Sequence, residues 1–203
     1  MKIIAIGRNY AAHAKELNNP VPGKPVIFLK PDTAVLKDNK PFYIPDFSQN
    51  IHFELEVVLK ISKEGKHIAE KFASKYYEEI GLGIDFTARD IQNEHKEKGL
   101  PWELAKAFDN SAAVSNFIPK EEFSDLKNLD FMLKINDQVR QQGNTSLMLF
   151  SYDYIISFVS QYFTLKKGDL IFTGTPEGVG QVHPDDKLQA TLSGRELLNF
   201  DIK

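Results

Sequence analysis

The sequence predicts a mixed α/β domain in which strands predominate. Short apolar segments bounded by Gly, Pro, Asn and Asp outnumber the segments with helical spacing, which favours strands. Their spacing along the chain is irregular, so the pattern does not match the regular strand and helix alternation of a doubly wound sheet. The chain has 203 residues, enough for one sizeable core, and we find no linker or internal repeat in it. One domain over residues 1–203 is therefore expected.

The first half of the chain begins with an apolar segment, residues 3–6, which predicts a short strand. Residues 9–25 are polar and rich in turn residues, with room for a short helix at 11–17. Functional loops often have this character, so 9–25 is the candidate lid over a site. Further strands are expected at residues 26–29, 34–36, 42–45 and 52–61.

The second half alternates between helical and strand patterns. Apolar residues recur at helical spacing over 150–163, with Ser151 as the expected N-cap, which predicts a helix whose apolar stripe is core. Residues 129–136 and 138–142 should form a hairpin around Asp137. The remaining elements are expected as helices at 69–79 and 87–98 and as strands at 80–86, 170–173, 187–192 and 198–202.

Composition excludes several kinds of protein. The formal net charge is -3, which argues against nucleic acid as a partner, since phosphate binding needs clustered Lys and Arg. Cysteine is absent, so disulfides, zinc thiolate sites and a cysteine nucleophile are excluded. No segment approaches the roughly 20 apolar residues of a membrane span, and the N-terminus lacks a signal-peptide pattern. The sequence therefore predicts a cytoplasmic protein with no membrane partner.

Three carboxylates form the candidate metal site. Glu54 and Glu56 alternate within the strand expected at 52–61, so both should project from one sheet face. A solvated sheet face would tolerate such a pair without any ligand. Asp85, however, stands in an apolar strand, where an unpaired carboxylate is costly to bury. Mg²⁺ or Mn²⁺ bound through carboxylate oxygens would remove that cost, which favours Glu54, Glu56 and Asp85 as metal ligands.

Polar side chains elsewhere are candidates for catalysis and substrate binding. His13 and Glu16 would share a helix face and could hold one water, although an exposed helix turn has the same spacing. Lys106 and Arg89, with Gln92 three residues after Arg89, could bind a substrate carboxylate or stabilise an enolate, although single surface charges are more common.

A glycine-rich loop follows the strand expected at 170–173. Residues 174–180 lack the ending of a P-loop and the spacing of a dinucleotide-binding loop, so a nucleotide site is disfavoured. A tight loop that presents the Thr175 hydroxyl and backbone N–H groups to a small anion remains open.

Seven stretches of the chain together resemble the fumarylacetoacetate hydrolase family, most closely its single-domain acylpyruvase and oxaloacetate decarboxylase branch. Their order and spacing span nearly the whole chain. They are Gly7-Arg-Asn-Tyr with His13 and Glu16, Phe28-Leu-Lys-Pro31, His52-Phe-Glu-Leu-Glu-Val57, Asp85-Phe-Thr-Ala-Arg-Asp90, Lys98-Gly-Leu-Pro-Trp102, Ala105-Lys-Ala-Phe108 and Gly174-Thr-Pro-Glu-Gly-Val-Gly180.

This resemblance implies a fold, an assembly and a set of site residues. The fold would be the family's β-roll of mixed sheets, and the assembly a homodimer. Lys106 would be the active-site lysine, and His13 with Glu16 the lid pair that prepares water. The implied metal ligands are Glu54, Glu56 and Asp85, and the implied substrate-binding residues are Arg8, Arg89, Gln92 and Thr175.

The resemblance also implies a reaction. We expect a Mg²⁺-dependent hydrolase that cleaves the C–C bond of acylpyruvates or related 2,4-dioxo acids, with oxaloacetate decarboxylase as the alternative. A Mg²⁺-dependent phosphoryl hydrolase and a non-catalytic β-rich binding module remain as alternatives of other classes. The substrate is left open, since Asp109-Asn-Ser-Ala-Ala replaces a Gly-Pro-containing stretch common in relatives, and the extra N-terminal domain of longer members is not expected.

Overall fold

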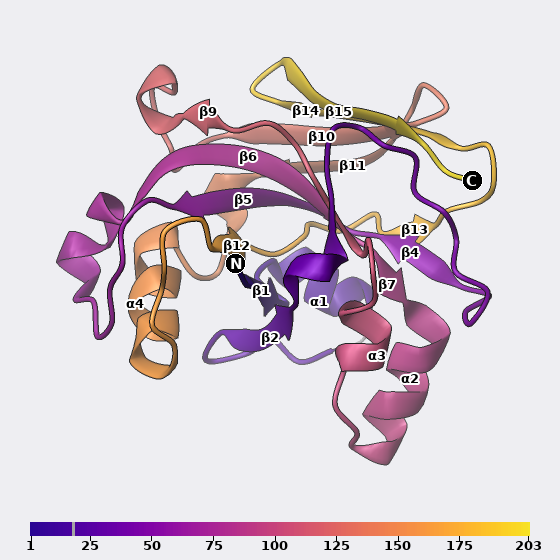
Figure 1. The fold of residues 1–203 in the computed structure, drawn as a ribbon, viewed down its shortest axis with the longest axis horizontal. Helices are drawn as coiled ribbons and strands as arrows, with labels where there is room; N and C mark the ends of the chain where they lie inside the picture. The colour runs from indigo at the N-terminus through magenta and orange to yellow at the C-terminus, as the bar shows by residue number, and fades with distance from the viewer. Residues whose placement is uncertain (18) are drawn as a thin grey trace.

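The computed structural model describes residues 1–17 and 19–203, and strands predominate in it, as the sequence predicts (Figure 1). The largest sheet contains, in spatial order, β2 (Val26–Lys30), β1 (Ile3–Gly7), β12 (Leu170–Phe172), β5 (Leu55–Ile61), β6 (Tyr77–Asp85), β8 (Ala112–Val114) and β3 (Val35–Leu36), with β9 (Ile118–Pro119) paired to β6. Figure 1 shows β5 and β6 as long, curved strands, so this sheet has the shape of a half-barrel.

Two smaller sheets and four α-helices complete the described residues. The second sheet has the order β11 (Gln138–Asn144), β10 (Asp130–Ile135), β14 (Lys187–Leu192) and β15 (Arg195–Asp201), and the third the order β13 (Gly180–Gln181), β4 (Ile51–Phe53) and β7 (Thr87–Ala88). The helices are α1 (Ala11–Glu16), α2 (Arg89–Lys98), α3 (Glu103–Lys106) and α4 (Tyr152–Tyr162). Short 3₁₀ turns lie at Asp32–Ala34, Glu70–Lys75, Lys120–Glu122 and Thr145–Leu147. No helix in residues 1–17 and 19–203 is long and apolar enough to cross a bilayer.

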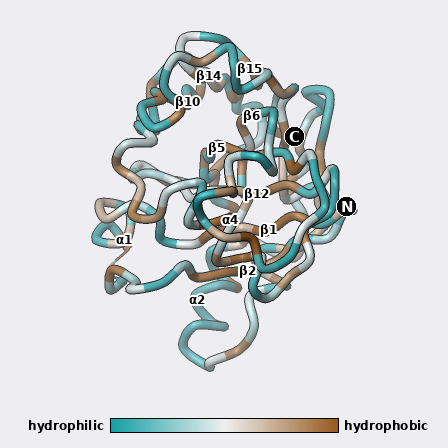
Figure 2. Tube along the Cα trace, turned by 90° about the vertical axis from the view of Figure 1, so that its left-hand side faces the viewer, coloured by the Kyte–Doolittle hydropathy of each residue, from teal (hydrophilic) through white to brown (hydrophobic). Residues whose placement is uncertain are grey.

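The central strands are apolar on both faces because both faces are covered. Val57 and Leu59 of β5 belong to the main core cluster, whereas Val58 points to the opposite face and packs with a second cluster that includes Phe172. Successive side chains of a strand point to opposite faces, so β5 contributes to both clusters. In Figure 2 hydrophobic segments follow the central strands, whereas α2 is largely hydrophilic. This rigid sheet is the scaffold from which the polar site residues project.

The strand expected at 52–61 is broken at Glu54. Residues 51–53 form β4 in the three-stranded sheet, whereas β5 begins at Leu55 in the large sheet. Two contacts fix the break: the carbonyl of Glu54 accepts a hydrogen bond from Asp85 N at 2.8 Å, and Leu55 N donates to the side chain of Gln141 at 2.8 Å. The chain therefore passes from one sheet to another at the first of the two glutamates.

Of the other expected elements, some form as predicted and others differ. The hairpin around Asp137 is confirmed as β10 and β11, and Ser151 caps α4 by accepting a 3.2 Å hydrogen bond from Tyr154 N. The helix expected at 69–79 is wrong: a 3₁₀ turn is followed by β6, which starts at Tyr77. The stripe of α4 is only partly core, since Tyr162 is 61% exposed. Its side chain belongs to an aromatic row along the helix, which periodicity alone does not distinguish from a buried stripe.

Candidate active site

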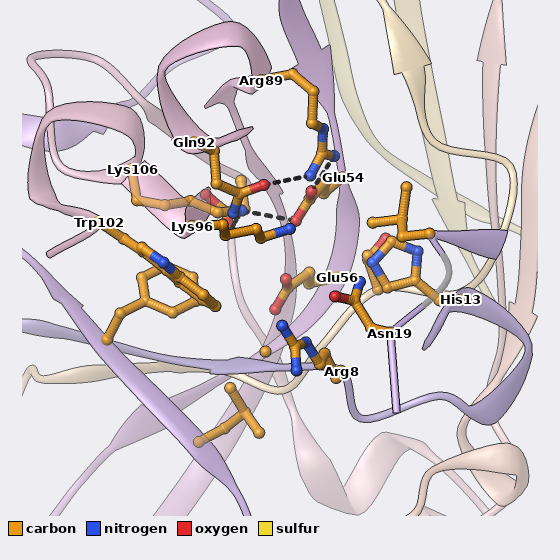
Figure 3. Close-up of a pocket in the computed structure, with 16 residues that line it drawn as sticks. Arg8, His13, Asn19, Glu54, Glu56, Arg89, Gln92, Lys96, Trp102 and Lys106 are labelled. Carbon is orange, nitrogen blue, oxygen red and sulfur yellow. Dashed lines mark hydrogen bonds and ion pairs between the residues drawn. The ribbon is translucent and has the colours of Figure 1, made fainter. Parts of the chain in front are cut away.

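Three buried carboxylates lie in a cavity between α1, α2, α3 and the large sheet (Figure 3). Glu54, Glu56 and Asp85 each offer a carboxylate oxygen within 4.8 Å of the others. Glu56 projects from β5 and Asp85 from the end of β6, while Glu54 lies at the break before β5. The pairing of Leu55 with Ile84 in the antiparallel register brings Glu54 opposite Asp85, so the cluster follows from the sheet topology.

Three cationic side chains surround the carboxylates. Lys106 Nζ lies 2.8 Å from Glu54 Oε2 and 2.6 Å from Asp85 Oδ2. Arg89 donates to Glu54 Oε1 at 2.5 Å and to Gln92 Oε1 at 2.7 Å. Lys30, at the end of β2, lies with its Nζ 2.6 Å from Asp85 Oδ1. Lys30 belongs to a stretch that carries the family resemblance, but no sequence pattern connects it with Asp85, 55 positions away.

The carboxylates differ in how they are neutralised. Burial acts to raise the pKa of Glu54, but the nearby Lys106 and Arg89 outweigh burial and hold that pKa well below its usual value. Burial, and next the negative charge of Asp85, raise the pKa of Glu56 well above its usual value. No Lys, Arg or His in residues 1–17 and 19–203 forms an ion pair with Glu56, which accepts a 2.7 Å hydrogen bond from Gly174 N. An additional cation would therefore be stabilised beside Glu56.

A divalent metal fits this donor set. The three ligands are oxygens of buried carboxylates, the chemistry that hard divalent cations prefer. The approach of the glycine-rich loop also requires glycine at position 174, where φ is +103° and a Cβ would lie 2.6 Å from the Cβ of Asn9. That close approach brings Gly174 N to Glu56 and orients its carboxylate.

The polar pair expected on the first helix is formed. His13 Nδ1 lies 3.2 Å from Glu16 Oε2, and the His13 side chain is buried against the cavity. The other oxygen of Glu16 accepts a 2.9 Å hydrogen bond from Gly178 N. This contact also needs glycine, because a Cβ at Gly178 would lie 2.3 Å from the carbonyl oxygen of Arg140. The pair is thus held between α1 and the glycine-rich loop.

Nine of the ten residues predicted from the sequence line this one cavity, and the tenth, Glu16, contacts the lining residue His13. Thr175 lines it with its hydroxyl bonded to Gln141 Nε2 at 2.8 Å, and Arg8 lines it from a left-handed turn with φ +60°. Lys96 and Trp102 also line the cavity, and no sequence pattern indicates a role for either of them. Lys96 lay in a polar helix where solvent exposure was the simpler expectation.

The expected lid segment, residues 9–25, is anchored at its start. The amide of Asn9 donates to Thr173 O at 2.7 Å and to Phe150 O at 3.1 Å, and its oxygen accepts from Phe150 N at 2.7 Å. Tyr10, the next residue, is 2% exposed. Asn18, also within the expected lid, lies outside the described residues. Any opening motion of this segment would have to begin after Tyr10.

The half-barrel sheet with a buried metal-binding cluster, a histidine and glutamate pair and several cations defines a metal-dependent enzyme for small anionic substrates. Residues 2–202 match the fumarylacetoacetate (FAA) hydrolase C-terminal family, and the chain belongs to this family. The expected family fold is confirmed by solved structures. A fumarylacetoacetate hydrolase family protein of Yersinia pestis, 40% identical, superposes with a TM-score of 0.96 over 100% of this chain and 93% of that one.

Several relatives are enzymes by name. A mitochondrial oxaloacetate tautomerase of Bos taurus is 45% identical over 99% of this chain and 91% of its own length. A mitochondrial oxaloacetate decarboxylase of Dictyostelium discoideum is 42% identical over 99% of this chain and 93% of its own. A fumarylpyruvate hydrolase of Pseudomonas aeruginosa, solved with Mn²⁺ and pyruvate, is 33% identical with a TM-score of 0.94, over 100% of this chain and 89% of that one.

The comparison corrects one expectation. The sequence predicted a cytoplasmic protein because it shows no targeting pattern, but the relatives from Bos taurus and Dictyostelium discoideum are both mitochondrial by name. The prediction of a cytoplasmic location is therefore wrong. Composition and the residues of a folded domain report how a chain folds and not where it is delivered.

Proposed function

We propose that this protein is a divalent-metal-dependent enzyme that acts on oxaloacetate, interconverting its keto and enol forms and also releasing CO₂ from it. The observation that carries the proposal is the buried cluster of Glu54, Glu56 and Asp85 beside Lys106 and Arg89. The names of the relatives supply the substrate, since those from Bos taurus and Dictyostelium discoideum are named for oxaloacetate. They favour the decarboxylase alternative over acylpyruvate cleavage, and tautomerisation was not anticipated from the sequence.

The proposed chemistry assigns each group a task. Glu54, Glu56 and Asp85 would hold the metal, which when bound would chelate the 2-oxo and adjacent carboxylate oxygens and offset negative charge at the C2 oxygen. Lys106 and Arg89 both pair with Glu54, so their positive charge lies beside the cluster, where it would also stabilise an enolate.

Proton transfer is assigned to the pair of His13 and Glu16. For tautomerisation the pair would accept a proton from C3 as the C3–H electron pair forms the C2–C3 double bond, and the C2 oxygen would then take up a proton. For decarboxylation the electron pair of the C3–C4 bond takes this place, CO₂ leaves and C3 is protonated afterwards. Both reactions therefore need a stabilised enolate, that of oxaloacetate for tautomerisation and that of pyruvate for decarboxylation, and they differ in which bond to C3 breaks.

Acylpyruvate hydrolysis is the second candidate. It is favoured by the 3.2 Å contact between His13 and Glu16, because hydrolysis needs a base that activates water. The fumarylpyruvate hydrolase of Pseudomonas aeruginosa belongs to the same fold and is solved with pyruvate. Membership of a family of enzymes for such acids leaves no support for the phosphoryl hydrolase or the non-catalytic binding module.

One preparation tests both candidates. The purified protein, loaded with Mg²⁺ or Mn²⁺, is assayed for loss of the oxaloacetate enol, for pyruvate release from oxaloacetate and for acetylpyruvate hydrolysis. We expect enol conversion to have the largest kcat/KM. If acetylpyruvate is cleaved with a larger kcat/KM than either oxaloacetate reaction, acylpyruvate hydrolysis is the main activity and the oxaloacetate proposal is wrong.

We further propose Mg²⁺ as the resident metal, with Mn²⁺ able to replace it, and a homodimer as the assembly. The oxygen donor set supports the metal class, and the dimer rests on the family resemblance. Light scattering should give a mass twice that of the 23.1 kDa chain. A mass of one chain at assay concentration would contradict the dimer.

A further inference from the structure

The cavity contains four cationic side chains, and only two of them are used to neutralise the carboxylate cluster. Lys106 and Arg89 both pair with Glu54. Arg8 and Lys96 line the same cavity, and neither forms an ion pair with a carboxylate within residues 1–17 and 19–203. Two cations facing one small cavity without a partner are available for an anionic ligand.

Both free cations lie over one aromatic ring. The guanidinium carbon of Arg8 is 6.0 Å from the centre of the Trp102 ring, and Lys96 Nζ is 5.8 Å from it. The ring itself is held by Phe28, whose centroid is 6.0 Å away. Cations at this distance are attracted to the ring face, so Trp102 fixes two flexible side chains that come from different parts of the fold. In Figure 3 the end of the Lys96 side chain lies above Glu56 and that of Arg8 lies below it.

The surroundings of Lys96 disfavour its own charge. Loss of hydration, and next the positive charges of Arg89 and Arg8, together lower the pKa of Lys96 to about 8. A surface lysine that served only for solubility would instead extend into water, as Lys98 does on the same helix, where it pairs with Glu94. The charged form of Lys96 is therefore destabilised at this position, and a bound anion would stabilise it.

We propose that Lys96 and Arg8, held over Trp102, bind the distal carboxylate of a dicarboxylic 2-oxo acid and so make the site selective for dianionic substrates. The inference rests on the proposed function for the identity of the diacid. The 2-oxo acid end is directed to the carboxylate cluster and its cations, whereas the distal end of a four-carbon diacid reaches the free pair. A monocarboxylic acylpyruvate would leave both cations unpaired.

The same contact bears on the choice of reaction. In decarboxylation the distal carboxylate becomes neutral CO₂ as the electrons of the C3–C4 bond move into the enolate, so an ion pair to that carboxylate is lost in the transition state. In tautomerisation the carboxylate keeps its charge throughout. An interaction stronger in the ground state than in the transition state slows a reaction. Lys96 and Arg8 therefore restrain decarboxylation and leave tautomerisation as the favoured outcome.

The test compares oxaloacetate with 2-oxosuccinamate, an analogue of similar shape whose distal group is a neutral amide. The wild type should prefer oxaloacetate in kcat/KM for enol conversion by about tenfold to a hundredfold, the scale of a hydrogen bond to a charged group. In Lys96→Met this preference should fall below about threefold, and Lys96→Arg should restore most of it. The ratio of pyruvate release to enol conversion on oxaloacetate should rise in Lys96→Met.

Lys98→Met is the matched control, because Lys98 lies on the same helix and outside the cavity, and this variant should keep the wild-type preference. The inference is overturned if Lys96→Met retains the preference, or if it lowers kcat/KM for both compounds equally. If the wild type does not turn over oxaloacetate, the proposed function fails, but calorimetric binding of the two compounds to metal-loaded enzyme still tests the subsite. A preference in binding that depends on Lys96 would then support the subsite without the reaction.

Discussion

Lys30 and Asp85 form an ion pair in which Nζ lies 2.6 Å from Oδ1, and neither side chain is exposed to solvent. The ammonium group also donates to the carbonyl and the hydroxyl of Ser111, at 2.8 and 3.0 Å. Burial lowers the pKa of Lys30, and the charge of Asp85 opposes that shift without cancelling it. Since Lys106 holds the other oxygen of Asp85 at 2.6 Å, this carboxylate is fixed in place by two lysines.

Removing Lys30 should destabilise the metal-free protein strongly. Lys30→Met leaves a buried carboxylate with one cation fewer, and breaking a buried pair in this way typically costs about 3 to 5 kcal/mol. Lys60→Met is the control, because its pair with Glu79 is partly exposed and should contribute less than about 1 kcal/mol. Urea unfolding of both variants gives the comparison. Equal and small losses would show that Lys106 alone neutralises Asp85.

Replacing Asp85 should abolish tight binding of the metal. Loss of a group that only orients a ligand commonly weakens metal affinity by 10-fold to 100-fold, so loss of a ligand in Asp85→Asn should weaken Mn²⁺ binding by more than about 100-fold. Free Mn²⁺ measured by electron paramagnetic resonance reports this directly. Asp90→Asn is the control, since Asp90 bonds to Ser48 and Gln49 away from the cavity. Unchanged Mn²⁺ affinity in a folded Asp85→Asn protein would remove Asp85 from the metal site.

The sequence predicted the members of the cluster, but for a reason that the structure revises. Alternation placed Glu54 and Glu56 on one face of a single strand, whereas the chain changes sheets at Glu54 and the register with β6 brings Asp85 to it. Local periodicity predicts the face of a strand from which a side chain projects, but it does not predict where the chain passes from one sheet to another. For the same reason Lys30 and Lys96 could not be assigned, since their contacts join segments far apart in the sequence. A role can be assigned to Lys30 and Lys96 only once the fold shows that β2, α2 and the Trp102 ring lie around one cavity.

Loss of Glu16 should slow acetylpyruvate hydrolysis, which needs a base to activate water, more than it slows decarboxylation of oxaloacetate. In Glu16→Ala both the contact to His13 and the bond from Gly178 N disappear. We expect acetylpyruvate hydrolysis to fall by about a hundredfold or more, the usual effect of losing a general base. Pyruvate release from oxaloacetate should fall less, since no water attacks. Lys15→Ala, at an exposed neighbouring position, serves as the control, and equal losses in both reactions would deny Glu16 the role of base.

Ligand binding should protect the segment that follows Tyr10. His13 lines the cavity, and Glu16 connects α1 to the glycine-rich loop, so an anion in the cavity adds contacts that hold α1 closed. Amide exchange in α1 should slow when saturating oxalate is added with the metal. The amides of β5 should not change, since they are already buried in the sheet. Exchange in α1 that is equal with and without oxalate would contradict a lid.

The affinity for oxaloacetate should fall as the pH rises through the pKa of Lys96. This pKa is lowered to about 8 in the free protein, by burial first and by neighbouring cations next. The charged groups that face Lys96 are Arg8 from the turn after β1, Arg89 from α2, Lys106 from α3 and Glu54 from the break before β5. Below its pKa the ammonium group is present to bind the distal carboxylate, and that carboxylate in turn raises the pKa in the complex.

Above the free-protein value the proton must be taken up on binding, so the KM for oxaloacetate should rise by about tenfold per pH unit, until the pKa of the complex is reached. A bound divalent cation adds positive charge, so the rise should begin at pH 8 or below it. The KM for 2-oxosuccinamate should not follow this course, because its amide gains nothing from the ammonium. Lys96→Arg should remove the rise, since a guanidinium stays charged throughout the range. A KM for oxaloacetate that rises equally in Lys96→Arg would assign the titration to another group and deny Lys96 its contact with the distal carboxylate.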